Sequence, residues 1–223
     1  MYLSRMHLNP RRRGTRLLVG NPQTVHAAVM SSFPPTAHGE GRVLWRMDRD
    51  GDHLALYILS PTAPSFEHIQ EQAGWSNQES WDVRPYGRVL DRITLGQEYS
   101  FRLVANPSRI VTGEDGKKRR FAHVTVDQQL GWLTDRASSL GVEFIDAGGV
   151  FDDEKRVPAV AVTSREISRF QRKGATVTVS RSQFDGAIRV TDVDALRSTL
   201  TNGVGKAKAY GCGLLTLAPL GRR

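Results

Sequence analysis

The stretch from residue 191 to residue 217 reads TDVDALRSTLTNGVGKAKAYGCGLLTL, and it gives the clearest indication of the fold of the C-terminal part of the chain. Thr191 or Asp192 can accept hydrogen bonds from the free N–H groups of a first helical turn, so we predict a helix over residues 192–201. The apolar run at residues 214–217 predicts a buried strand. A helix, a glycine-rich turn and a strand in this order are typical of the end of a β-α-β-β-α-β unit.

Four glycines and two lysines lie between this helix and this strand. Without a Cβ atom, glycine lets backbone N–H groups point at an anion, and the lysines add positive charge. We therefore predict a phosphate-binding loop, with a flexible or tightly packed turn as the alternative. The spacing fits neither the nucleotide-hydrolysing nor the dinucleotide-binding glycine motif, which disfavours both functions. The residues assigned to binding are Gly203, Gly205, Lys206, Lys208, Gly211 and Gly213.

The rest of the chain shows the same order of elements twice. In the first half we predict strands over residues 1–9, 43–47, 54–59 and 81–88, helices over 21–33 and 65–73, and a loop at 10–14. In the second half we predict strands over 97–105, 142–151, 159–168 and 176–190, and a helix over 126–140 that ends at Gly141. These patterns predict an α+β fold of two tandem ferredoxin-like (RRM-like) domains. The expected domains are residues 1–90 and 95–223, divided near 89–96.

Composition excludes several classes of protein. The 223 residues include 31 Lys and Arg against 23 Asp and Glu, a net charge of +8, and 39% are hydrophobic, which supports real cores and argues against a disordered or fibrous chain. The apolar runs are far shorter than the roughly 18 residues that span a bilayer, and the N-terminus lacks a secretion signal. We expect no membrane segment. The single Cys212 predicts a reducing cytoplasm, and the positive charge predicts a polyanionic partner.

Two basic segments are candidate nucleic-acid contacts. Residues 163–174 predict a hairpin that carries Arg165, Arg169, Arg172 and Lys173 at its tip, a shape that suits a nucleic-acid groove, with a solvated hairpin as the alternative. The second segment, with Lys117, Lys118, Arg119 and Arg120, follows a turn. Residues 119–126 partly match the aromatic strand motif of RNA-recognition modules, but too few aromatics are present for a base-stacking platform.

His26 is the candidate proton carrier. It follows the helix start Asn21-Pro22 in a chain that we expect to bind RNA, and an imidazole with a pKa of about 6.5 exchanges protons at neutral pH. The alternative is a structural or simply exposed histidine. No H-E-x-x-H motif, His/Asp cluster or pair of carboxylates predicts a metal site, and residues 152–154 are typical of a solvated acidic turn.

Taken together, these segments resemble the CasE family, the CRISPR precursor-RNA endoribonucleases of the Cascade surveillance complex. The resemblance covers essentially the whole chain and is most specific at residues 203–215. The other matching segments are Leu8-Asn9-Pro10, Asn21-Pro22 with His26, Phe33-Pro34, the basic run before residues 129–133, Arg136-Ala137, Gly141, Phe184-Asp185-Gly186, residues 190–192 and Leu196.

The resemblance implies an enzyme that binds one CRISPR repeat stem-loop and cuts on the 3′ side of the stem. It implies cleavage without metal or other cofactor, by attack of the ribose 2′-hydroxyl on the adjacent phosphate, and assembly with other Cascade subunits. By position, His26 matches the family's catalytic histidine. The resemblance also places these basic residues nearest the RNA: Arg165, Arg169, Arg172, Lys173, Lys206 and Lys208.

Two residues depart from the family pattern. Gln23 stands where some members carry a tyrosine, and Ala27 stands where an arginine often follows the histidine. A glutamine side chain cannot exchange a proton at neutral pH, which leaves the partner of His26 in acid–base chemistry open. This departure favours the main alternative function, a non-catalytic subunit that holds a processed guide RNA. A generic RNA-recognition protein is a third alternative, which the shortage of stacking aromatics disfavours.

Overall fold

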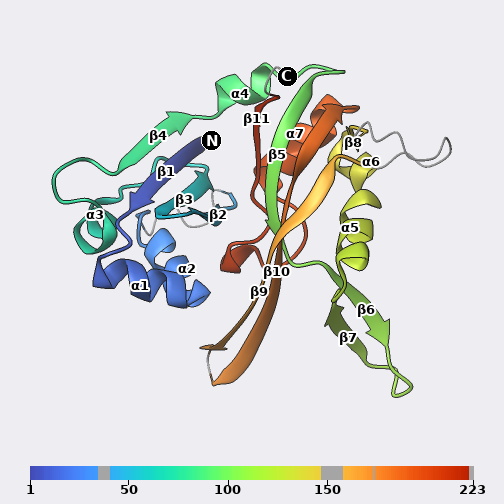
Figure 1. Cartoon of the computed structure of the whole chain (residues 1–223), viewed down its shortest axis with the longest axis horizontal. Coiled ribbons are helices and arrows are strands. Elements are labelled where there is room, and N and C mark those ends of the chain that lie inside the picture. The colour runs from blue at the N-terminus through green and yellow to red at the C-terminus, as the bar shows by residue number, and fades with distance from the viewer. Residues whose placement is uncertain (35–40, 147–157, 173, 221–223) are drawn as a thin grey trace.

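The computed structural model describes residues 1–34, 41–146, 158–172 and 174–220, and it shows a mixed α/β fold with antiparallel sheets (Figure 1). The first half contains β1 (Tyr2–Leu8), α1 (Arg13–Gly20), α2 (Pro22–Met30), β2 (Leu44–Asp50), β3 (His53–Ser60), α3 (Glu67–Ala73), β4 (Trp81–Pro85) and α4 (Gly87–Asp91). The second half contains β5 (Glu98–Ala105), β6 (Ser108–Thr112), β7 (Lys118–Ala122), α5 (Val126–Thr134), α6 (Ala137–Leu140), β8 (Val142–Phe144), β9 (Val160–Arg172), β10 (Ala175–Val190), α7 (Val193–Asn202), the 3-10 helix η2 (Lys208–Tyr210) and β11 (Leu215–Pro219).

The first four strands form one antiparallel sheet in the order β2-β3-β1-β4. Successive side chains of a strand point to opposite faces, so Met6 and Leu8 of β1 share a face. They pack with apolar residues of α1, α2 and α3, among them Leu18, Val25 and Ile69, in one buried cluster. Helices α1, α2 and α3 thus cover a single face of this sheet.

The second half forms a sheet with the strand order β11-β5-β10-β8. In the first sheet, β4 pairs with β1, and β3 lies between β1 and β2. In the second sheet, β11 pairs with β5 in the same way, and β10 lies between β5 and β8. Side chains of α5 and α7, among them Trp132, Leu196 and Leu200, pack with Leu103 and Phe184 of the sheet in a second buried cluster. Repetition of one strand order agrees with the repeated element order read from the sequence.

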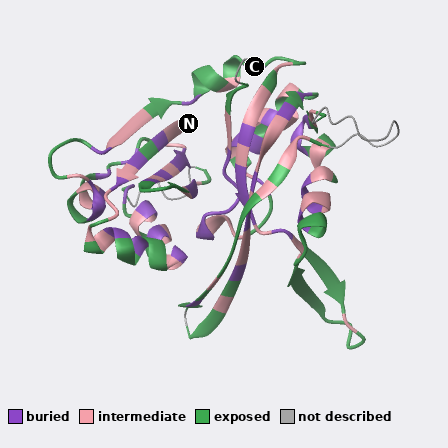
Figure 2. Ribbon diagram, viewed as in Figure 1, coloured by how far each residue is buried: buried purple, intermediate pink, exposed green. Residues whose placement is uncertain are grey.

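Two antiparallel ribbons extend from the second half at the same end of the molecule (Figure 1). One is formed by β9 and the first part of β10, which pair from Gly186 with Val160 to Ala175 with Arg172, with a register shift between Gln183 and Phe184. The other is the β6–β7 pair. Both are largely exposed, whereas buried residues gather between the sheets and their helices (Figure 2). The ribbons are therefore exposed arms on a packed body.

The two halves are joined by a buried arginine. Arg46 of β2 is 2% exposed and donates to both carboxylate oxygens of Asp48, at 2.6 and 2.9 Å. Its Nη1 also donates to the carbonyls of Arg102 and Leu214 in the second half, at 2.9 and 3.1 Å. One guanidinium therefore bonds to both sheets.

Several predicted boundaries are wrong. The loop expected at residues 10–14 ends at Arg12, because helix α1 begins at Arg13 and is stabilised by burial of Thr15 and Leu18. The helix expected over 126–140 is split into α5 and α6 where the Thr134 hydroxyl bonds back to the carbonyls of Leu130 and Gly131. The strand expected to reach residue 88 ends at Pro85, before α4. Part of the strand predicted over 142–151 lies outside the described residues.

Candidate functional site

His26 is positioned by helix α2, whose start follows directly from the sequence. The Asn21 side chain accepts a hydrogen bond from the Gln23 N–H, and Pro22 occupies the first helical position. Val25 and Val29 are buried against the sheet. His26, the next residue round the helix from Val25, is left half-buried at the edge of this contact. Gln23 is half-buried as well, and its Oε1 atom is buried without a hydrogen-bond partner in the described structure.

Helix α2 packs on η2 of the glycine-rich loop and contacts β9 of the β9–β10 ribbon, which we call the long ribbon. Through this packing, the Arg172 guanidinium is near enough to His26 for its charge to act on the imidazole. Burial, and after it the positive charge of Arg172, lower the pKa of His26 below its ordinary value of 6.5. His26 is therefore mainly neutral at pH 7 in the free protein and can accept a proton.

The basic residues of β9 are divided between the two faces of the ribbon. Arg172 pairs with Ala175 at the turn, so it lies at the tip as predicted, but Arg165 pairs with Ser182, roughly 24 Å back along the strand. The prediction that all of these groups lie at the tip is wrong for Arg165. Arg165 and Arg169 share one face, and Arg165 Nη1 donates to the Val124 carbonyl at 3.2 Å. Lys173 lies outside the described residues.

Arg172 projects from the opposite face of the ribbon, together with Phe170. Its Cζ atom lies 5.9 Å from the ring centroid of Tyr210, and the Phe170 ring meets the Tyr210 ring edge-on at 4.9 Å. Tyr210 belongs to η2, which packs on α2. Phe170 and Tyr210 are site residues that were not predicted from the sequence. The only available signal was an aromatic residue inside a lysine- and glycine-rich loop.

The glycine-rich loop is packed mainly by protein. A Cβ atom on Gly211 would lie 2.6 Å from the Trp45 ring, and one on Gly203 would lie 2.8 Å from the Leu44 side chain. Gly213 is buried, and a Cβ atom there would lie 2.8 Å from the Val204 carbonyl oxygen. These three glycines therefore fit the alternative of a tightly packed turn. Their predicted role in phosphate binding stays a prediction.

Two other members of the loop are open to solvent. Gly205, with φ +72°, and Lys206 are exposed. Lys208 is half-buried and donates to the Asn202 carbonyl at 2.7 Å. Burial, then the charges of Arg42 and Lys206, lower the pKa of Lys208. Positive charge thus gathers on the exposed side of the loop.

The β6–β7 ribbon carries the second basic segment. Lys117, Lys118, Arg119 and Arg120 are all exposed, and Arg119 forms an ion pair with Asp115 at 2.6 Å. These strands pair only with each other among the described strands, so the partial match to an RNA-recognition strand is not part of a main sheet. The basic side chains remain available as a charged surface.

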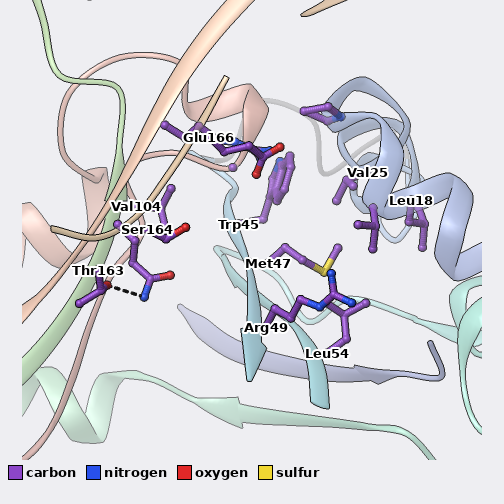
Figure 3. A pocket seen from close by; sticks show the side chains of 15 residues that line it. Leu18, Val25, Trp45, Met47, Arg49, Leu54, Val104, Thr163, Ser164 and Glu166 are labelled. Atoms are coloured by element: carbon purple, nitrogen blue, oxygen red, sulfur yellow. Dashed lines mark hydrogen bonds and ion pairs between the residues drawn. The ribbon is translucent and has the colours of Figure 1, made fainter. Parts of the chain in front are cut away.

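A pocket of about 340 Å³ lies between the two halves, beside α2 (Figure 3). Leu18, Val25 and Met47 line its apolar side, and Ser164 and Gln183 of the ribbon line its polar side. The described residues contain no group of three or more His, Cys, Asp or Glu side chains placed to hold a metal ion. No described helix is long and apolar enough to span a membrane. The pocket marks where the helix that carries His26 faces the ribbon that carries Arg172.

Comparison with known proteins identifies the class of this chain. The sequence model of the family described as "CRISPR associated protein" matches residues 1–219, so the chain belongs to this family. It is 27% identical over 228 residues to the CRISPR-associated endoribonuclease Cse3 of Thermus thermophilus, which covers 98% of this chain and 100% of that protein. It is also 27% identical over 143 residues to the CRISPR system Cascade subunit CasE of Escherichia coli, covering 60% of this chain and 64% of that protein.

Solved structures agree with this assignment. A structure of the CRISPR endoribonuclease Cse3 bound to a 19-nucleotide RNA has a TM-score of 0.76 and 27% identity, covering 98% of this chain and 99% of that chain. A Thermus thermophilus Cse3 structure with an RNA that represents a pre-cleavage complex has a TM-score of 0.76 and 26% identity, covering 98% of each chain. The mixed α/β fold with antiparallel sheets is thus the fold of these relatives.

Proposed function

We propose that this chain is an endoribonuclease that binds the stem-loop of CRISPR repeat RNA and cleaves the precursor on the 3′ side of the stem. The observation that supports this most is the convergence of His26 with Arg172 of the basic ribbon, on elements that come from different halves. Similarity over the full chain to an endoribonuclease with a solved pre-cleavage RNA complex supports the same function. Similarity to CasE, a Cascade subunit, supports assembly with other Cascade subunits.

In the proposed reaction the RNA supplies its own nucleophile. The ribose 2′-hydroxyl attacks the adjacent phosphorus, the bond to the 5′ oxygen of the next nucleotide breaks, and the products are a 2′,3′-cyclic phosphate and a 5′-hydroxyl. His26, neutral because its pKa is lowered, accepts the proton of the 2′-hydroxyl, and the resulting imidazolium returns a proton to the leaving oxygen. The Arg172 guanidinium stabilises the negative charge that develops on the phosphoryl oxygens. These steps call on no metal or other cofactor.

The exposed basic groups then serve to bind the stem. Arg165 and Arg169 on one face of the long ribbon, Arg119 and Arg120 on the short ribbon, and Lys206 on the loop offer positive charge to phosphates. An A-form stem has a deep, narrow major groove that side chains read poorly, so we expect recognition by shape and backbone charge.

The finer description of the fold belongs to this proposal. Each half has the strand order expected of a β-α-β-β-α-β unit, which supports two tandem ferredoxin-like domains, residues 1–90 and 95–223. In this division the first domain carries His26, and the second carries the basic ribbon and the glycine-rich loop. The single buried Cys212 is consistent with the cytoplasm as the place of the reaction.

The test is a cleavage assay on a repeat stem-loop RNA with a metal chelator present. We expect His26→Ala to lower the cleavage rate by roughly 10²–10⁴ with little change in RNA affinity, because a placed proton carrier acts mainly in the transition state. His53→Ala is the matched control, since His53 is an exposed histidine of the same half. A substrate with a 2′-deoxyribose at the cut site should bind and stay intact.

The alternative function is a non-catalytic subunit that holds a processed guide RNA, and Gln23 is the residue that favours it. Tight binding of the stem-loop by the wild-type protein without any cleavage would establish that alternative. Cleavage by His26→Ala at the wild-type rate would refute the role of His26. Cleavage that requires an added divalent metal would refute the metal-independent mechanism.

A further inference from the structure

We propose that Tyr210 is a positioning residue for cleavage: its aromatic ring, fixed by Phe170, holds the Arg172 guanidinium beside His26. This inference rests on the proposed function, in which Arg172 stabilises the charge of the phosphoryl group. Tyr210 belongs to the glycine-rich loop, and its ring is buried, so its role is to position Arg172 and not to contact the RNA.

Tyr210 is held firmly by the loop around it. The residue is 8% exposed, and η2 is flanked by two residues in the left-handed conformation, Ala207 with φ 61° and Gly211 with φ 79°. The Tyr210 N–H donates to the Ala207 carbonyl at 2.9 Å. Buried Cys212, Val104 and Val179 belong to the same apolar cluster as Tyr210 and Phe170. The ring therefore has little freedom to move.

Arg172, in contrast, has little else to restrain it. It is exposed, it precedes the turn of the ribbon, and its guanidinium makes no hydrogen bond or ion pair with any described side chain or carbonyl. A long arginine side chain at such a place has many rotamers. Its guanidinium lies over the Tyr210 ring, whose negative face attracts a cation within about 6 Å of the centroid. The ring thus selects the rotamers of Arg172 that point toward α2.

The ring of Tyr210, and not its hydroxyl, carries this task. The Tyr210 hydroxyl oxygen is buried and has no hydrogen-bond partner in the described structure. Because this oxygen is shielded from solvent, RNA bound at the protein surface does not contact it. Tyr210→Phe removes this unpartnered group and keeps the ring, whereas Tyr210→Leu removes the ring and keeps an apolar side chain. The pair of variants separates the two parts of the residue.

The pKa of His26 reports the position of the Arg172 guanidinium in the free protein, because the charge of Arg172 acts on the imidazole. His26 is the one titratable side chain of helix α2. The titratable and charged residues on the elements packed against or bonded to it are Arg13 and Arg16 of α1, Glu67, His68 and Glu71 of α3, Lys208 and Tyr210 of η2, and Arg165, Glu166, Arg169 and Arg172 of β9. Among these, the charge of Arg172 acts with burial to lower the pKa of His26. Loss of the Tyr210 ring should let the guanidinium move away, so the pKa of His26 should rise.

The experiment compares wild type, Tyr210→Phe and Tyr210→Leu in three measurements: single-turnover cleavage, RNA affinity, and NMR titration of the His26 ring in the free protein. We expect Tyr210→Phe to match wild type in all three. We expect Tyr210→Leu to cleave roughly 10²-fold more slowly with nearly unchanged affinity, the scale of loss for a misplaced catalytic group, and to show a higher pKa for His26. In an Arg172→Ala background, Tyr210→Leu should cause no further loss.

A further variant keeps the test valid if Tyr210→Leu does not fold. Arg172→Lys leaves the core intact and keeps the charge, but an ammonium group lacks the planar guanidinium that stacks on a ring, so it should also slow cleavage. Loss of cleavage in Tyr210→Phe would overturn the proposal, because the hydroxyl would then be the active group. An unchanged His26 titration in Tyr210→Leu, or full activity in Arg172→Lys, would overturn it as well. If wild type does not cleave RNA, the proposed function fails, while the titration still tests the contact itself.

Discussion

Replacing Arg46 by methionine should destabilise the protein strongly, because this side chain bonds to both halves. The variant removes two hydrogen bonds to Asp48 and those to the carbonyls of Arg102 and Leu214. The Arg46 and Asp48 side chains are 3% and 13% exposed, so water does not replace the lost partner freely. After the change, the ion pair left to the Asp48 carboxylate among the described residues is the longer contact with Arg102 Nη1, at 3.5 Å.

The magnitude follows from the burial of this pair. Removing one partner of a buried ion pair costs about 3–5 kcal/mol, and the remaining contact with Arg102 places the expected loss near the lower end, about 3 kcal/mol. For a chain of this length, that loss corresponds to a fall in Tm of about 6–12 °C. The loss comes from leaving Asp48 uncompensated. The double variant Arg46→Met, Asp48→Leu should therefore be more stable than Arg46→Met alone.

The assay is urea unfolding followed by tryptophan fluorescence, with thermal unfolding as a second measurement. Arg49→Met is the matched control, because Arg49 lies on the same strand and is exposed, and its effect should stay within about 0.5 kcal/mol. A loss below about 1 kcal/mol in Arg46→Met would refute the reasoning. So would a double variant that is less stable than Arg46→Met.

Two further predictions concern the candidate site. Gln23→Ala should lower cleavage less than His26→Ala, since an amide can only orient a group or donate a hydrogen bond, and equal loss in the same assay would contradict this. Arg169→Ala should weaken RNA binding and reduce the slope of log affinity against log salt by about 0.7–0.9, the value for one lost phosphate contact. Gly205→Val places a Cβ atom 3.1 Å from the Trp132 ring at φ +72°. Its RNA-binding defect comes from shape and not from charge, so it should persist at low salt. Equal rescue of Arg169→Ala and Gly205→Val at low salt would contradict a role for the loop backbone in binding.

The amino-acid pattern is enough to predict the start of the helix that carries His26 and the order of the main sheet strands in each half. Asn21 and Pro22 predict the start of α2 because capping depends on atoms within one helical turn. Gly141 predicts a helix end, and it does adopt the left-handed conformation there, with φ 77°. Alternating apolar residues predict β1 and β5 because the two faces of a strand alternate with a period of two. Boundaries failed where a distant contact decided them, as at α1, whose Thr15 hydroxyl bonds to the Ala73 carbonyl.

Which side chains contact one another depends on the packing of elements that are distant in the sequence. The basic segment 163–174 was visible in the sequence, but pairing within the ribbon sends Arg169 to one face and Arg172 to the other, where α2 and η2 are packed. The glycines of the loop fit a phosphate cradle and a tight turn equally well until Trp45 and Leu44 are found against them. Tyr210 gains its contact with Arg172 only when η2 and β9 pack together. Rules of capping and periodicity describe forces within a few residues of one another, whereas the charge at His26 depends on how two halves of the chain pack.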